Sequence, residues 1–155
     1  MNTKLRPRPV PGLGLAAIGA AEEALVLEVL RSKALFRYAG LDPATPPTMT
    51  ARLEKEFRDT LGTDYALAVS SGTGALEVAM AAAGIGPGDE VMVTAWSWIA
   101  CFTAIVRVGA RPVLAEIDDT LNLDPAEIAR LTTPHTRAVL VIHYQGVPAD
   151  MERIQ

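Results

Sequence analysis

Residues 65–94 read YALAVSSGTGALEVAMAAAGIGPGDEVMVT, and this stretch contains the pattern that decides the fold. A short apolar run, Tyr65–Ser70, leads into an alanine-rich segment, Thr73–Ala83. A second apolar run, Glu90–Thr94, follows a turn rich in glycine. Short apolar runs bounded by turn residues are typical of buried strands, and the alanine-rich segment favours a helix. The stretch therefore predicts a strand–helix–strand unit.

Helix and strand patterns continue to alternate along the chain. The expected further helices are 18–32, 50–61, 97–108 and 125–131, and the expected further strands are 112–117 and 137–143. Strands that alternate with helices form a parallel sheet with right-handed crossovers. The last strand is apolar at consecutive positions, as a strand covered on both faces requires. We therefore predict an α/β fold with a mostly parallel sheet and helices on both faces.

Two regions follow from the distribution of proline and glycine. Residues 1–17 are rich in both and predict an irregular N-terminal arm. Residues 18–155 are expected to form part of one domain, because the helix pattern near Gln155 brings no closing element and the sheet would continue in further residues. Although the arm is basic, its prolines and glycines would break the helix of a leader, so we expect no export.

Composition excludes several classes of protein. The 155 residues are 50% hydrophobic and 21% charged, and disordered chains have the opposite balance. The 14 basic and 18 acidic residues give a net charge of −4 without a basic cluster, so nucleic-acid binding is not expected. The longest uncharged run, Val91–Val106, is short for a bilayer span. The single cysteine, Cys101, fits a reducing compartment, and we expect a cytoplasmic protein.

Polar and aromatic residues follow each predicted strand. These clusters are Ser70–Gly74, Thr94–Trp98, Asp118-Asp119 and His143–Gly146. Ligands of open parallel sheets bind beyond the carboxyl ends of the strands, so we expect the clusters to meet at one edge. The two aspartates could equally be turn and cap residues.

The segment Ser71-Gly72-Thr73 suits a phosphate. It opens a predicted helix, whose first turn has free N–H groups and the positive end of the helix dipole. Gly72 permits close approach of the backbone, and the Ser71 and Thr73 hydroxyls can donate. The alternative is that Ser71 only caps the helix and nothing binds there.

Trp98 could offer a flat face to a planar ligand at the same edge. The alternative is a core tryptophan buried under a helix. The only histidines are His135 and His143, and no Cys–His cluster exists, so no metal site is expected. His135 follows Pro134 in a predicted loop and is expected to be solvated. His143 ends a strand, where a ligand role and a structural role are both open.

Seven motifs, in this order and spacing, resemble the N-terminal part of the DegT/DnrJ/EryC1/StrS family of sugar aminotransferases. The motifs are ALVLEVLRS at 24–32, SSGTGAL at 70–76, GPGDEV at 86–91, SWIA at 97–100, VGARPV at 108–113, LNLDP at 121–125 and HYQGVPAD at 143–150. The resemblance begins near Ile18 and covers less than half of a typical member. It implies the large domain of a fold-type I transferase that uses pyridoxal 5′-phosphate (PLP).

The resemblance implies roles for particular residues. Gly72 and Thr73, beside Ser71, match the positions that hold the cofactor phosphate, and Trp98 matches the aromatic residue that stacks on the pyridine ring. His143 and Gln145 fall in a segment beside the active site. The loop that contains Arg37 and Tyr38 would face the substrate.

Two residues that the family requires do not match any position in this chain. The aspartate that pairs with the pyridinium nitrogen and the lysine that holds the cofactor are both expected beyond Gln155. The lysines present are Lys4, Lys33 and Lys55, and none is assigned that role. No catalytic residue is therefore predicted here, and we expect the chain by itself to be inactive.

For the whole protein, the resemblance implies an enzyme that moves an amino group from glutamate or glutamine to a keto-sugar or keto-cyclitol. Such relatives are homodimers that share the site between subunits. Two alternatives remain open. One is a dehydratase of the same family, in which histidine replaces the lysine. The other is a gene remnant or partner-binding fragment without catalysis.

Overall fold

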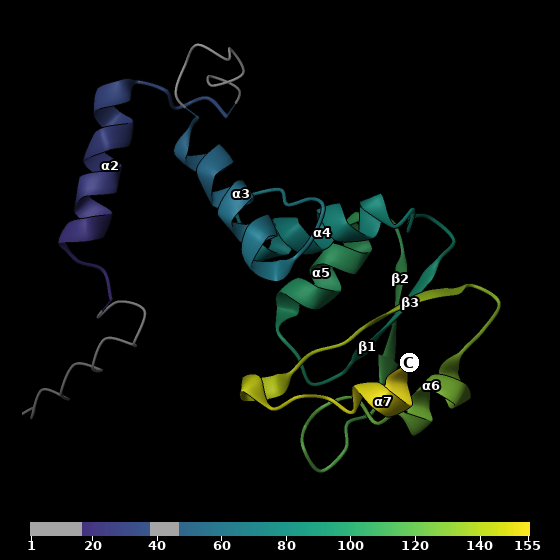
Figure 1. Cartoon of the computed structure of the whole chain (residues 1–155). Coiled ribbons are helices and arrows are strands. Elements are labelled where there is room, and N and C mark those ends of the chain that lie inside the picture. The colour runs from purple at the N-terminus through teal and green to yellow at the C-terminus, as the bar shows by residue number, and fades with distance from the viewer. Residues whose placement is uncertain (1–16, 38–46) are drawn as a thin grey trace, which may run out of the picture. The chain divides into compact units, whose positions relative to one another are not determined.

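The computed structural model describes residues 17–37 and 47–155, and the chain divides into two units after Ala68. In the first unit, α2 (Ala20–Ser32) and α3 (Met49–Leu61) are helices (Figure 1). The Thr48 hydroxyl caps α3 by accepting a hydrogen bond from the Ala51 N–H at 3.2 Å. Gly62 ends α3 at φ +66°, the left-handed conformation that glycine adopts without strain.

The second unit contains the sheet. In chain order its elements are α4 (Gly72–Ala82), β1 (Glu90–Thr94), α5 (Ile99–Arg107), β2 (Arg111–Ala115), α6 (Ala126–Leu131), β3 (Thr136–Leu140), the 3₁₀ turn η1 (Tyr144–Gly146) and α7 (Met151–Ile154). The three strands are parallel in the order β2-β1-β3. The central strand pairs Met92 with Val113 on one side and with Val139 on the other. The predicted parallel α/β architecture is confirmed.

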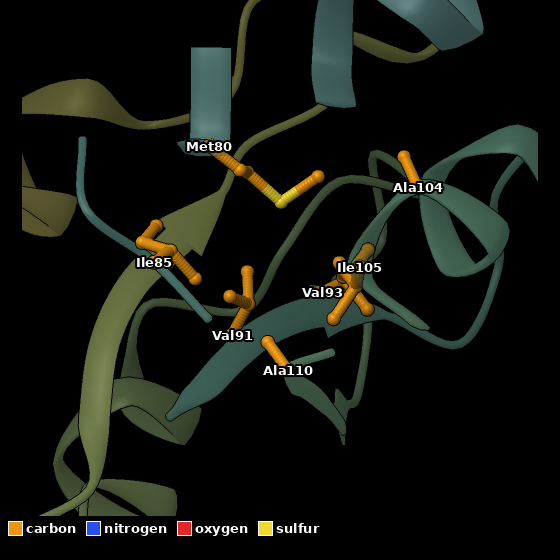
Figure 2. Close-up of a cluster of buried hydrophobic side chains, with 7 residues drawn as sticks. All are labelled: Met80, Ile85, Val91, Val93, Ala104, Ile105 and Ala110. Atoms are coloured by element: carbon orange, nitrogen blue, oxygen red, sulfur yellow. The ribbon is translucent and has the colours of Figure 1, made fainter. Parts of the chain in front are cut away.

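Alternate side chains of β1 are buried on opposite faces of the sheet. Val91 and Val93 pack with residues of α4 and α5, including Met80 and Ile105 (Figure 2). Met92 packs on the other face with Leu123 and with Ile128 of α6. The full set on the first face is Met80, Ile85, Val91, Val93, Ala104, Ile105 and Ala110. Helices therefore cover both faces of the sheet.

The prediction of a strand at Tyr65–Ser70 is wrong. These residues form no strand, and no strand of the described residues pairs with them. An apolar run becomes a strand only where a neighbouring strand supplies backbone partners. Here the Ala68 N–H instead donates to the buried Glu54 carboxylate of α3 at 2.8 Å. The sheet of the described residues therefore has three strands, not four.

The other predicted elements are present with small shifts at their ends. Among these, β3 ends at Leu140 and not at His143, so the segment that contains His143 leaves the sheet earlier than predicted. Asp124 caps the start of α6, since its carboxylate accepts a hydrogen bond from the Ala126 N–H at 2.9 Å. The proposed arm at residues 1–17 lies outside the described residues except for Ala17, and the domain limits remain a prediction.

Several carboxylates are held ionised by hydrogen bonds. Hydrogen bonds from the Arg130 guanidinium and from the Glu116 N–H lower the pKa of the Glu127 carboxyl to about 2. At the start of β1, the buried Glu90 accepts hydrogen bonds from Thr133 and Arg111, which lower its pKa. Glu127 joins α6 to the end of β2, so its charge state affects one face of the sheet.

Replacing Glu127 should flatten the pH dependence of stability. A carboxyl whose pKa is lowered on folding stabilises the folded state above its ordinary pKa, and this contribution is lost as pH falls towards the folded value. For Glu127 that window runs from about pH 4.5 down to about pH 2. Glu127→Gln should lower the free energy of unfolding at pH 7 and lose less stability on acidification than the unmodified chain, measured by urea titrations. The matched control, Glu152→Gln on the exposed surface, should keep the original slope. An unchanged slope in Glu127→Gln would contradict the assignment.

Replacing Gly109 should also lower the stability of the folded chain. Its φ is +86°, and an added Cβ would lie 2.9 Å from the Pro87 Cγ. Gly109→Ala should therefore lower the free energy of unfolding by about 1–3 kcal/mol, measured by chemical denaturation. Gly86→Ala is the control in the same corner, because its Cβ would meet nothing closer than the Val108 carbonyl oxygen at 3.7 Å. Equal losses in both variants would show that backbone strain is not the cause.

Candidate functional site

The first turn of α4 keeps two backbone donors available. Ser71 is the N-cap, and its hydroxyl oxygen accepts a hydrogen bond from the Gly74 N–H at 3.0 Å. The N–H groups of Gly72 and Thr73 have no hydrogen-bond partner among the described residues. The capping role of Ser71 is thus confirmed, but Ser71 satisfies only one of the N–H groups that lack an intrahelical partner at the start of α4. The cap therefore does not preclude binding of an anion at this turn.

The space around Gly72 is also open enough for a phosphate to approach the backbone. An added Cβ at Gly72 would meet no atom within 4 Å, and both Ser71 and Gly72 are exposed. A phosphate could therefore reach the backbone of the first turn. Two free N–H groups, two hydroxyls and the positive end of the helix dipole form a donor set that suits a phosphate. The residues present fit the phosphate of the implied cofactor.

Trp98 lies at the start of α5 and is not a core residue. It occupies the N-cap position of that helix, and 78% of its surface is exposed. Within the second unit, the alternative of a tryptophan buried under a helix is therefore wrong. An exposed indole face can accept a planar aromatic ring, in the offset-stacked arrangement that aromatic pairs prefer.

The segment after β3 forms the opposite wall of a hollow with Trp98. The hollow has a volume of about 390 Å³, and its lining consists of Trp96, Ser97, Trp98, Ile142, His143, Tyr144 and Gln145. The structure thus brings together three predicted site residues, namely Trp98, His143 and Gln145. Residues that follow β1 and residues that follow β3 meet because the two strands are parallel neighbours.

His143 is fixed by a local hydrogen bond. Its Nδ1 accepts a hydrogen bond from the Ala149 N–H at 3.0 Å. An imidazole that accepts at Nδ1 carries its proton on Nε2, so in this tautomer Nε2–H is the donor available to a ligand. Gln145 has φ +51° and follows Tyr144 in the tight turn η1. Both residues are exposed, which leaves His143 Nε2 and the Gln145 side-chain amide accessible to a ligand.

The first turn of α4 lies towards the same edge of the sheet. The chain reverses between the end of α4 and the start of β1, with Gly84 and Gly88 at positive φ in the connection. Helix α4 therefore runs opposite to β1, and its first turn lies towards the edge at which β1 ends. Ser71, Gly72 and Thr73 do not line the hollow itself.

The other described residues that the sequence singled out do not line the hollow. Tyr38 lies outside the described residues, and Arg37 makes an ion pair with Glu54 at 2.5 Å within the first unit. Asp118 is a turn residue that accepts hydrogen bonds from Thr120, and His135 is exposed. The residues that the structure describes contain no group of His, Cys, Asp and Glu suited to a metal ion. No helix among them is long and apolar enough to cross a membrane.

Sequence reasoning missed two residues of the site. The Tyr144 ring meets the Trp96 ring edge-on, with centroids 6.1 Å apart and planes at 60°. Asn122 is buried and hydrogen-bonds to the segment after β3. Tyr144 and Asn122 both lie inside motifs quoted above. Nothing in those motifs shows that Asn122 contacts Tyr144, which lies 22 positions later in the chain, or Val147, which lies 25 positions later.

Comparison with known proteins gives the family. The model of the DegT/DnrJ/EryC1/StrS aminotransferase family matches residues 18–155. The structure of 3-amino-5-hydroxybenzoic acid (AHBA) synthase is similar, with 35% identity, a TM-score of 0.79 and coverage of 88% of this chain and 34% of that chain. An aminotransferase from Psychrobacter cryohalolentis has 33% identity and a TM-score of 0.79, with coverage of 94% of this chain and 34% of its own.

A third similar structure contains a cofactor. NtdA from Bacillus subtilis, solved with bound PMP, has 30% identity and a TM-score of 0.74, with coverage of 99% of this chain and 34% of that chain. The present chain thus spans about a third of the length of these three structures. With the match of the family model over residues 18–155, this chain belongs to the DegT/DnrJ/EryC1/StrS aminotransferase family.

Proposed function

We propose that residues 69–155 provide the phosphate- and ring-binding part of a PLP-dependent aminotransferase. The observation that carries this proposal is the exposed face of Trp98 on the hollow, at the position where the family places an aromatic residue over the cofactor ring. The unpartnered N–H groups of Gly72 and Thr73 support it, because they offer donors for the phosphate. Of the similar structures, that from Psychrobacter cryohalolentis is named as an aminotransferase and NtdA contains PMP, which favours transamination over dehydration.

Each residue has a stated task in this proposal. Gly72 and Thr73 bind the phosphate through backbone N–H groups, and the Ser71 and Thr73 hydroxyls add donors. Trp98 stacks on the ring and orients it. His143 Nε2–H and Gln145 offer hydrogen bonds at the opposite wall. Bound PLP supplies an aldehyde and an electron-withdrawing ring, chemistry that no side chain offers.

The complete reaction would transfer an amino group from glutamate or glutamine to a keto-sugar or keto-cyclitol. It requires a lysine to hold the cofactor and an aspartate beside the ring nitrogen, and the family places both after residue 155. Residues 69–155 contain no lysine. We therefore propose that the 155 residues alone bind the cofactor without transaminating, and that the whole protein is a cytoplasmic homodimer.

Binding of pyridoxamine 5′-phosphate (PMP) tests the pocket directly. This probe lacks an aldehyde, so it cannot condense with Lys33 or Lys55 on the surface. The chain should bind PMP more tightly than pyridoxamine, which lacks the phosphate, measured by equilibrium dialysis. Trp98→Ala should weaken binding of both probes about tenfold, and Trp98→Phe should restore most of it, because stacking needs a flat ring.

Gly72→Val isolates the phosphate contact. The substitution is tolerated inside the protein because nothing lies within 4 Å of the Cβ, but the side chain would block the approach of a phosphate. It should therefore weaken binding of PMP and leave pyridoxamine binding unchanged. Equal affinity of the unmodified chain for the two probes, or no binding of either, would refute the proposed pocket.

The source gene offers a test of the complete activity. Sequencing beyond the codon for Gln155 should show an open frame that encodes an aspartate and then a lysine at the family's positions. A histidine at the lysine position would overturn transamination in favour of dehydration. A stop codon directly after Gln155 would leave at most a cofactor pocket and contradict the proposed enzyme.

A further inference from the structure

The segment that forms one wall of the hollow has few ties to the rest of the chain. Within residues 143–149, Gly146 N–H donates to the His143 carbonyl and Val147 N–H to the Tyr144 carbonyl, so these hydrogen bonds are local. Apart from the Met151 N–H, which donates to the Ala149 carbonyl where the chain enters α7, two hydrogen bonds connect the segment to other described residues, and both involve Asn122. Among the described residues outside the segment, Asn122 is thus the one whose side chain hydrogen-bonds to this wall.

Asn122 is placed to make both hydrogen bonds at once. Its Oδ1 accepts from the Tyr144 N–H at 2.8 Å, and its Nδ2 donates to the Val147 carbonyl oxygen at 3.1 Å. Asn122 is 0% exposed, so bulk water does not reach its amide in the folded chain. The orientation of the amide is unambiguous, because an N–H can only donate and a carbonyl can only accept. A leucine of similar size would leave both backbone groups unpaired.

The loop that carries Asn122 is itself braced. Asp118 accepts hydrogen bonds from the N–H and the hydroxyl of Thr120, at 2.8 and 2.5 Å. The Thr120 oxygen in turn accepts from Asn122 Nδ2 at 3.1 Å, and the Asp118 N–H donates to the Asn122 carbonyl at 2.9 Å. The chain Asp118–Thr120–Asn122 therefore fixes the amide before it meets the wall.

The wall also contains backbone that needs external support. Gln145 has φ +51° and Gly146 has φ +82°, and a non-glycine residue at positive φ costs free energy that the surroundings must offset. The two atoms that Asn122 binds lie on either side of this pair, at Tyr144 and Val147. Tyr144 in turn contacts Trp96 on the opposite wall. Asn122 thus sets the turn at Gln145 and, through Tyr144, the spacing of the two walls.

We infer that Asn122 is a positioning residue of the ligand site: its buried amide holds Tyr144 and Val147 so that His143 and Gln145 face Trp98 across the hollow. This inference rests on the proposed function for the identity of the ligand. The positioning itself can be measured without any ligand, through the contact between Tyr144 and Trp96. The two claims can therefore fail separately.

The first measurement is near-ultraviolet circular dichroism of the full chain. Trp96→Phe identifies the part of the spectrum that comes from the Trp96–Tyr144 pair. Asn122→Leu and, at pH 8, Asn122→Asp should both lose that signal, because neither side chain donates to the Val147 carbonyl. Leu123→Ala, a neighbouring core residue, controls for general destabilisation and should keep the signal.

Acidification provides a rescue that a merely structural role would not give. A protonated aspartic acid has the shape of asparagine and supplies one donor and one acceptor, and burial favours this neutral form. Between pH 8 and pH 5.5 the Asn122→Asp signal should return, while Asn122→Leu stays without it and the unmodified chain is unchanged. Retention of the signal in Asn122→Leu, or no return in Asn122→Asp, would overturn the inference.

Binding of PMP then links the wall to the site. Asn122→Asp at pH 8 should bind PMP about tenfold more weakly than the unmodified chain, a loss that corresponds to about one net hydrogen bond. Binding should recover on acidification, after correction for the unmodified chain. Unchanged binding together with a lost dichroism signal would overturn the role in the ligand site. Failure of the unmodified chain to bind PMP would overturn the proposed function, while the dichroism still decides whether Asn122 positions the wall.

Discussion

Burial of β1 on both faces is the constraint around which residues 69–155 are arranged. Val91 and Val93 need cover on one side and Met92 on the other, and burying one such side chain contributes about 1.5–3 kcal/mol. Helices α4 and α5 provide the first cover, and α6 lies on the second face with Leu123 (Figure 1). A parallel strand with both faces covered must then be reached and left through crossover helices, which gives the order of elements observed.

This arrangement creates the candidate site as a consequence of chain direction. Parallel strands end at the same edge, so Trp98 after β1 and His143 after β3 line one hollow although they are far apart in the chain. The helices run back from that edge, which leaves the free N–H groups at the start of α4 directed towards it. Under the proposed function, the backbone N–H groups at the start of α4 supply the positive partial charge for a phosphate, and no charged side chain lines the hollow beside Trp98.

The wall formed by residues 143–149 has fewer hydrogen bonds to the scaffold than the strands have to one another. β3 ends at Leu140, so the wall formed by residues 143–149 has no strand ladder and depends on the buried Asn122 amide. A buried amide with both partners in place specifies one loop conformation, because any other arrangement leaves a backbone group unpaired. The start of α4 thus belongs to a helix packed on the sheet, whereas the opposite wall is tied to the scaffold by the Asn122 amide.

The sequence by itself determined the parallel α/β architecture, the capping of α4 by Ser71 and the candidate roles of Gly72, Thr73 and Trp98. These depend on local signals, namely apolar periodicity, cap residues and the motifs of the family. Only the tertiary structure decided that Tyr65–Ser70 pairs with no strand of the described residues, that Trp98 is exposed in place of being a core residue, and that Tyr144 meets Trp96. The sequence of an apolar run is the same whether or not a neighbouring strand pairs with it, and the sequence around a tryptophan is the same whether or not other residues bury it. The contacts of Asn122 were equally hidden, because a hydrogen bond between a side chain and a backbone group 25 residues away leaves no periodic trace in the sequence.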